Sequence, residues 1–234
     1  MLFKRIFFLI VISLLINACV NSIDGNGNVI NETRKVESFN KIDISGGYEV
    51  VLNQGDIERL EIEIDENLID YIKTNVKKNT LFIKSKKNFG KTKAMKIYIT
   101  VVNIKAIEVS GAIKLTNKGI YKGDKLKIDV SGAADIDLEL KVEKLVMDMS
   151  GASETTLKGS STNFKIELTG AGELDAEKFK TQHTSVEISG AGEAKVYAKK
   201  TLDIEVSGAG SIHYKGNPTI TKDISGAGSI KELK

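Results

Sequence analysis

One tripeptide, Ser-Gly-Ala, returns seven times between residue 110 and the C-terminus, and it constrains the fold of this 234-residue chain more than any other feature. Successive copies begin 18 to 21 residues apart, and the fourth copy has Thr in place of Ser. The copies begin at Ser110, Ser131, Ser150, Thr169, Ser189, Ser207 and Ser225. A repeat of this length, with the same small residues at one point in each copy, is typical of a solenoid whose stacked repeats share one core.

Apolar residues recur at fixed positions around each tripeptide. The residue immediately before Ser or Thr is apolar in all seven repeats, and the residue three before it is apolar in six. This alternation predicts a strand that ends at the tripeptide, and further apolar residues five positions after Ser predict a second, shorter strand. The invariant apolar column is Val109, Val130, Met149, Leu168, Ile188, Val206 and Ile224. We therefore predict an all-β parallel β-helix, a single-stranded β-solenoid with 18–21-residue coils and a right-handed winding.

Glycine and the last repeat refine this prediction. The Gly of each tripeptide is expected to permit a sharp backbone corner and to leave room for the neighbouring coil. In the last repeat, Lys222 occupies an inward column and Pro218 stands shortly before it. Terminal repeats of such folds are atypical, so residues around 218–234 are expected to cap the stack.

The region before the repeats is less regular but shares their chemistry. Residues 36–64 and 81–101 alternate as strands do, whereas residues 66–76 place apolar side chains at helical spacing. Ser45-Gly46-Gly47 resembles a degenerate first copy of the tripeptide. We divide residues 36–234 into an irregular part, 36–104, and a repeat part, 105–234.

The N-terminus has the features of a lipoprotein signal peptide. Lys4-Arg5 precedes an apolar stretch from Ile6 to Ile16, too short to span a bilayer comfortably, and Ile16-Asn17-Ala18-Cys19 resembles a bacterial lipobox. We predict a signal peptide at residues 1–18 and lipidation of Cys19, the only cysteine; the alternative is an unmodified thiol. Residues 19–35 are polar and contain two glycines, which predicts a lipidated terminus followed by a tether.

Composition excludes some classes of protein and leaves others open. Apolar residues make up 41% of the chain, enough for a substantial core. The formal net charge is +3, with Lys4 and Arg5 in the segment predicted to be removed, so nothing in the charge balance calls for nucleic acid. The single cysteine excludes a disulfide within one molecule.

An unbroken acidic column lies two residues before each tripeptide, where alternation points side chains outward. We call this set the acidic column: Glu108, Asp129, Asp148, Glu167, Glu187, Glu205 and Asp223. A partial second acidic column follows four residues after the Ser, at Asp135, Glu154, Glu173 and Glu193. Like charges one coil apart repel by about 1 kcal/mol per pair in water, so the columns need compensating cations. These are either neighbouring lysines such as Lys127 and Lys165, on a solvated face, or a bound cation such as Ca²⁺ or a cationic partner.

No catalytic constellation is evident in the sequence. His183 and His213 are the only histidines and lack partners at metal-ligand spacing, which favours ordinary surface or core positions. Tyr197 and Tyr214 are assigned to one column of the second strand, either as core residues or as a carbohydrate platform. The repeated serines have no adjacent histidine base and are interpreted as corner residues rather than nucleophiles.

Several stretches together resemble the putative auto-transporter adhesin, head GIN domain family of bacterial envelope proteins. They are Gly25–Val29, Glu32–Val36, Phe39–Tyr48, Asn53–Asp56, Asp65–Leu68 and the Ser-Gly-Ala copies. The resemblance covers essentially all of the chain after Cys19. It implies a β-helical domain on a secreted or lipid-anchored protein, and it supplies no catalytic residues.

We therefore predict a non-enzymatic, membrane-anchored protein of the bacterial cell envelope that acts as a binding, adhesion or structural module. Its expected partners are the membrane, through Cys19, and a glycan or envelope protein; no cofactor is expected, apart from the Ca²⁺ considered above. Val20 after Cys19 favours the outer membrane. Two alternatives stay open: a β-helix polysaccharide-active enzyme, and an envelope scaffold or sensor without a small ligand.

Overall fold

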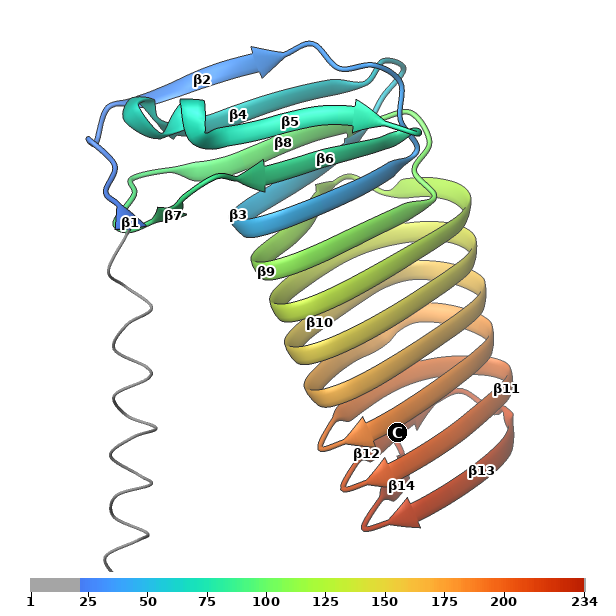
Figure 1. Cartoon of the computed structure of the whole chain (residues 1–234). Coiled ribbons are helices and arrows are strands. Elements are labelled where there is room, and N and C mark those ends of the chain that lie inside the picture. The colour runs from blue at the N-terminus through green and yellow to red at the C-terminus, as the bar shows by residue number, and fades with distance from the viewer. Residues whose placement is uncertain (1–21, 234) are drawn as a thin grey trace, which may run out of the picture.

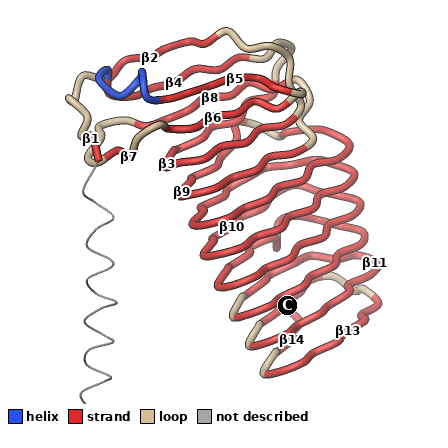
Figure 2. Tube along the Cα trace, viewed as in Figure 1, coloured by secondary structure: helices blue, strands red, loops and turns tan. Residues whose placement is uncertain are grey.

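A computed structural model describes residues 22–233 of the chain (Figure 1). The described chain is 78% strand and 3% helix, without a closed barrel, so the prediction of an all-β fold is confirmed. Within residues 22–233, helix is confined to one short segment near the N-terminal end (Figure 2). The predictions of a signal peptide at 1–18 and of lipidation at Cys19 lie outside the described residues.

The repeat part is a stack of parallel strands. It comprises β9 (Ala106–Lys118), β10 (Tyr121–Gly190), β11 (Glu193–Gly208), β12 (Ser211–Lys215), β13 (Thr219–Gly226) and β14 (Ser229–Glu232). Equivalent residues lie side by side without offset: Ser110 pairs with Ser131, Ser189 with Ser207, and Ser207 with Ser225. The spacing of the tripeptide in the sequence therefore becomes the register of the sheet.

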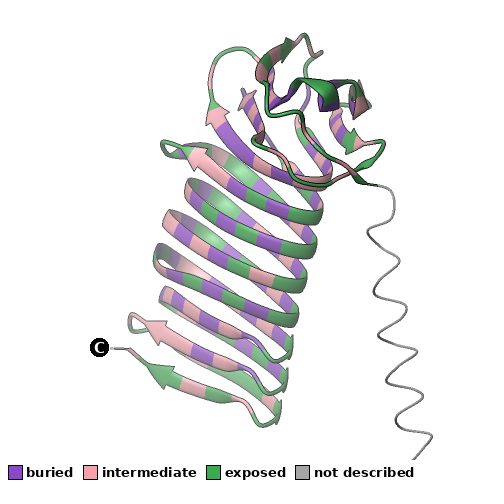
Figure 3. Cartoon of the chain, turned by 90° about the vertical axis from the view of Figure 1, so that its left-hand side faces the viewer, coloured by how far each residue is buried: buried purple, intermediate pink, exposed green. Residues whose placement is uncertain are grey.

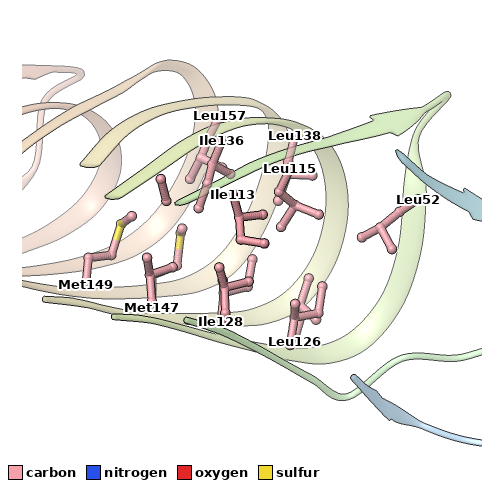
Figure 4. Packing of buried hydrophobic residues seen from close by; sticks show 14 of the residues in the cluster. Leu52, Ile113, Leu115, Leu126, Ile128, Ile136, Leu138, Met147, Met149 and Leu157 are labelled. Atoms are coloured by element: carbon pink, nitrogen blue, oxygen red, sulfur yellow. The ribbon is translucent and has the colours of Figure 1, made fainter. Parts of the chain in front are cut away.

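Inward columns of apolar side chains form one continuous core. Buried and exposed residues alternate along each strand, as the striped ribbons of Figure 3 show. Ile128 and Met147 are fully buried and pack against residues of neighbouring repeats (Figure 4), and Leu145 is fully buried in the same core. Full burial of such a side chain stabilises the fold by about 1.5–3 kcal/mol, and no single repeat could supply that environment alone.

The irregular part closes the N-terminal end of the stack. In β3 (Lys41–Gln54), residues before Gly46 pair with β6 (Thr80–Ser85), and residues after Gly47 pair with β8 (Met95–Val101). These two layers are extended by antiparallel strands: β5 (Ile72–Lys77) beside β6, and β4 (Arg59–Asp65) and then β2 (Val29–Arg34) beside β8. β3 also pairs with β9, with Ser45 beside Ser110, which confirms Ser45-Gly46-Gly47 as the first copy of the corner.

Two sequence-based expectations differ from the structure. Residues 22–34 are not a tether: β1 (Ser22–Ile23) pairs with β7 (Asn88–Phe89), and β2 pairs with β4. β2 is an edge strand, so one of its two sides stays exposed and the strand needs few apolar residues. Its composition in the sequence therefore resembles that of a polar linker. The helix expected over residues 66–76 is only a 3-10 helix, η2 (Glu66–Tyr71).

The remainder of that expected helix is β5, because it forms a hairpin with β6. Lys77 pairs with Thr80, and the two residues between them, Lys78 and Asn79, have φ values of +50° and +59°. Positive φ at both central residues is the requirement of a two-residue hairpin turn whose twist matches the strands. The turn chemistry overrides the helical spacing of the side chains.

Arg34 ties the two layers of the N-terminal region together. From the end of β2, its guanidinium donates hydrogen bonds to the carbonyl oxygens of Ile72 and Ile69, at 2.7 and 3.2 Å, and to Thr74 Oγ1 at 3.1 Å. It also pairs with Glu32 at 2.5 Å. These bonds hold the outermost strand of one layer, β2, against η2 and β5 of the other.

Candidate functional site

The Ser-Gly-Ala corners form one edge of the stack, and their glycines are there for steric reasons. Gly151 has φ +115°, and a Cβ atom on it would lie 2.3 Å from the carbonyl oxygen of Gly132 in the preceding repeat. Any side chain would therefore collide with the next corner as well as strain the backbone. The same relation recurs at every corner: Gly111, Gly132, Gly151, Gly170, Gly190, Gly208 and Gly226.

The acidic column runs beside this edge, as predicted, on the outward side of the strands. Glu108 pairs in register with Asp129, Glu187 with Glu205, and Glu205 with Asp223. Asp43 of β3 extends the column by one member, because it pairs with Glu108. Sequence reasoning missed Asp43, although the degenerate copy at residues 45–47 would have located it two positions upstream.

Lysines neutralise the middle of the acidic column. Lys127 Nζ lies 2.7 Å from Asp129 and 2.9 Å from Asp148, and Lys165 pairs with Glu167. Hydrogen bonds to Asp129 and Asp148 raise the pKa of Lys127. Burial alone would raise the pKa of Asp148, but its hydrogen bonds, with Lys127 first among them, hold that pKa below its ordinary value. The solvated, lysine-screened face is thus realised at these positions.

A groove of about 570 Å³ follows this part of the column. Its lining includes Asp43, Glu108, Asp129, Asp148 and Glu167, together with Lys84 and Lys127, whereas Glu187, Glu205 and Asp223 lie outside it. Within residues 22–233, no group of three or more His, Cys, Asp or Glu side chains is arranged to hold a metal ion. Binding of Ca²⁺ along the acidic column stays a prediction.

A second groove, which we call the alanine groove, follows the other side of the corners and has a volume of about 830 Å³. The exposed Ala of the first six of the seven corners lies along it, at Ala112, Ala133, Ala152, Ala171, Ala191 and Ala209. Its other lining residues include the second acidic column: Asp135, Glu154, Glu173 and Glu193. Lys114 pairs with Asp135 at 2.5 Å and Lys195 with Glu193 at 3.3 Å, so the ends of that column are compensated.

Small side chains give the alanine groove its shape. The residue after the corner Ala changes along the groove, from Ile113 and Ala134, which are buried in the core, through Ser153 to Gly172 and Gly192. At the corners themselves, the side chain exposed to this groove is only the methyl group of Ala. Sequence reasoning found the acidic residues of this groove but not the groove itself, whose signal was the run of small residues after the tripeptide.

The histidines and tyrosines do not gather into a site. His183 Nδ1 lies 2.9 Å from Thr201 Oγ1, and His213 Nε2 lies 3.8 Å from Glu193. The expectation that Tyr197 and Tyr214 share a column is wrong: Tyr214 pairs with Val196, and Tyr197 pairs with Lys215. The register between these repeats is unbroken, but Tyr197 stands eight residues after Ser189, whereas Tyr214 stands seven residues after Ser207.

Residues 38–218 match the family described as putative auto-transporter adhesin, head GIN domain. The chain belongs to this family. Within the part of the chain described, no helix is long and apolar enough to cross a membrane. A comparison with curated proteins finds no match.

Solved structures of similar proteins support the fold. A putative adhesin from Bacteroides fragilis is 29% identical, with a TM-score of 0.84 over 91% of this chain and 100% of that one. A putative lipid binding protein from Parabacteroides distasonis is 26% identical, with a TM-score of 0.76 over the same shares. A putative adhesin from Parabacteroides distasonis, 22% identical with a TM-score of 0.75 over 91% of this chain and 100% of that one, is similar in fold. These names are consistent with adhesion or binding rather than with an enzymatic activity.

Proposed function

We propose that the protein is a non-enzymatic, lipid-anchored adhesion or binding module of the bacterial cell envelope. The stack of parallel strands is, in this proposal, a right-handed parallel β-helix, and the anchor is Cys19 at the outer membrane. Membership of the adhesin family and the names of its structural relatives support the binding role. The register of the repeats, with like residues side by side along the stack, supports the β-helix.

The alanine groove is the observation that carries the proposed binding role. It extends over six repeats, from Ala112 to Ala209, and is open along its length. A long, shallow surface made of repeated residues suits an extended partner, such as a glycan chain or an extended segment of another envelope protein. Exposed alanines leave room for such a partner, and the neighbouring carboxylates supply hydrogen-bond acceptors.

Filling the groove tests this role. Ala152→Trp with Ala191→Trp places two large side chains on exposed corner positions, whereas Thr162→Trp places one on an exposed position outside the groove lining. We expect the groove variant to lose binding on a glycan array or in a pull-down from envelope extracts, while Thr162→Trp retains it. Retention by both variants would contradict the groove as the binding site. Wild-type binding to neither probe would favour the scaffold or sensor.

The anchor needs a separate test. Metabolic labelling with a fatty-acid analogue should mark the wild-type chain and not Cys19→Ala. Fractionation of the labelled cells should then place the protein in the outer membrane. Equal labelling of both chains, or no labelling of either, would contradict lipidation at Cys19.

A further inference from the structure

The first strand of the described residues lies very close in sequence to the proposed anchor. Ser22 and Ile23 form β1, which pairs with Asn88 and Phe89 of β7. Only two residues separate Cys19 from Ser22. Three residue steps span at most about 11 Å, so a membrane that holds Cys19 also lies close to β1 and β7.

Backbone hydrogen bonds fix β1 firmly to the segment around β7. Gly90 N–H donates to the carbonyl oxygen of Ile23 at 2.9 Å, and Gly25 N–H donates to that of Lys91 at 2.8 Å. The Asp24 carboxylate accepts the N–H of Lys91 at 2.8 Å. The segment 86–93 therefore cannot move away from β1 without breaking these bonds.

This segment, which we call the anchor-side loop, carries a concentration of positive charge. Lys86, Lys87, Lys91 and Lys93 are all exposed, and within residues 22–233 none of them forms an ion pair. Among the described residues, the hydrogen bond from Lys93 Nζ goes to the carbonyl oxygen of Gly27, at 3.4 Å. The nearby carboxylates of Asp24 and Asp65 are already engaged as acceptors of backbone N–H groups.

We propose that the anchor-side loop docks on the anionic headgroups of the membrane surface that holds the protein. Two observations point to anionic lipid as the partner of this loop. The loop pairs with β1, which is separated by only two residues from the anchor position, and the positive charge of the loop complements anionic lipid. Basic residues near a negatively charged membrane each add to binding, and a lipid chain combined with a basic patch anchors a protein more firmly than either signal alone. In Figure 1, β1 and β7 lie together at one corner of the N-terminal region, far from the last repeat.

The inference deepens the proposed function because it takes Cys19 as the anchor, yet it can be tested without lipidation. Chains of residues 19–234 carrying Cys19→Ala, which correspond to the protein after removal of the predicted signal peptide, are mixed with vesicles of phosphatidylcholine alone or with phosphatidylglycerol added, and sedimentation gives the bound fraction. The loop variant combines Lys86→Gln, Lys87→Gln, Lys91→Gln and Lys93→Gln. Its matched control, with the same loss of charge far from the loop, combines Lys141→Gln, Lys144→Gln, Lys199→Gln and Lys200→Gln, all of them exposed and none of them in an ion pair within the described chain.

We expect the loop variant to bind anionic vesicles about tenfold or more weakly than its parent, and the control about twofold more weakly at most. High salt should remove the difference, since the attraction is electrostatic. Replacing the same four lysines with Arg should retain binding, and circular dichroism and the melting temperature check that each variant is folded. Equal losses in the loop variant and the control, or no loss in the loop variant, would overturn the proposal.

The two proposals fail in different ways. If fatty-acid labelling at Cys19 is absent while the loop lysines still govern vesicle binding, the anchor is wrong and the docking surface stands. If labelling is present while the loop lysines have no effect on vesicle binding, the anchor stands and the docking surface is wrong.

Discussion

The repeat part and the N-terminal region share one core but are held together by different interactions. In the repeat part, the same contacts recur at each level: apolar columns inside, and a glycine above a glycine at each corner. In the N-terminal region the decisive contacts occur once each, as at Arg34 and at Asp65. A repeated contact is visible as a period in the sequence, whereas a contact made once between distant segments leaves no such signal.

Asp65 illustrates the second kind of contact. Its carboxylate is fully buried at the end of β4 and accepts the N–H groups of Gly27 at 2.6 Å and of Lys93 at 2.8 Å, with Ala94 N at 3.3 Å. One side chain thus joins the segment before β2 to the segment before β8. Burial acts to raise the pKa of Asp65, but these backbone hydrogen bonds outweigh burial and lower that pKa below its ordinary value.

The largest effect is expected from breaking a corner in the repeat part. In Gly151→Ala the new Cβ would meet the carbonyl oxygen of Gly132 at 2.3 Å, at a φ of +115°. We expect a loss of about 3 kcal/mol or more in the free energy of unfolding, measured in urea. Gly119→Ala is the control, because Gly119 also has positive φ, +70°, but nothing lies within 4 Å of its Cβ position. Its loss should be about 1 kcal/mol, and equal losses in the two variants would contradict the steric role of the corner.

A smaller effect is expected from removing the contact made by Asp65. Asp65→Ala removes the acceptor of two partly buried hydrogen bonds from the N–H groups of Gly27 and Lys93, which should lower the melting temperature by roughly 5 °C. Asp70→Asn, at an exposed position of η2, should leave the melting temperature nearly unchanged. An unchanged melting temperature in Asp65→Ala would show that the N-terminal region is held by its apolar contacts alone.

The pH dependence of stability gives an independent check on Asp65. A carboxyl group whose folded-state pKa is lowered stabilises the fold above its unfolded pKa of about 3.9, and this contribution is lost as the pH falls through the folded-state value. The difference in stability between wild type and Asp65→Asn should therefore be constant from neutral pH down to about pH 5 and shrink below about pH 4. A difference that does not change over that acidic range would argue against the ionised carboxylate as the acceptor.

The smallest effect is expected in the acidic column. Lys127→Gln removes an exposed ion pair with Asp129 and Asp148 and should cost about 1 kcal/mol at most, since exposed ion pairs contribute little. The loss should vanish in high salt. Lys141→Gln, an exposed lysine that forms no ion pair within the described chain, should change the unfolding free energy by less than about 0.5 kcal/mol at any salt concentration. A larger, salt-independent loss at Lys127 would mean that the column is held by more than surface electrostatics.

Much of the repeat part was predictable because the same pattern of residues recurs in every repeat. The column positions of Val130, Ser131 and Asp129 predicted that Val130 is buried, that Ser131 stands at a corner and that Asp129 faces outward, and the structure places them so. The alanine groove was not foreseen, since it depends on how far each small residue leaves the surface unfilled. The tether and the helix predicted before the repeats were wrong because β2 and β5 are defined by their partners β4 and β6 rather than by their own composition.

The sequence by itself determined that this chain is all-β, where its corners fall and which column faces the core, because period-two alternation repeated every 18 to 21 residues admits few other arrangements. Only the tertiary structure decided which lysines neutralise which carboxylates, and that Ser22 and Ile23 pair with the strand in the anchor-side loop. Those relations join residues tens of positions apart through backbone pairing. Local patterns of apolar and polar residues do not indicate which distant segments pair.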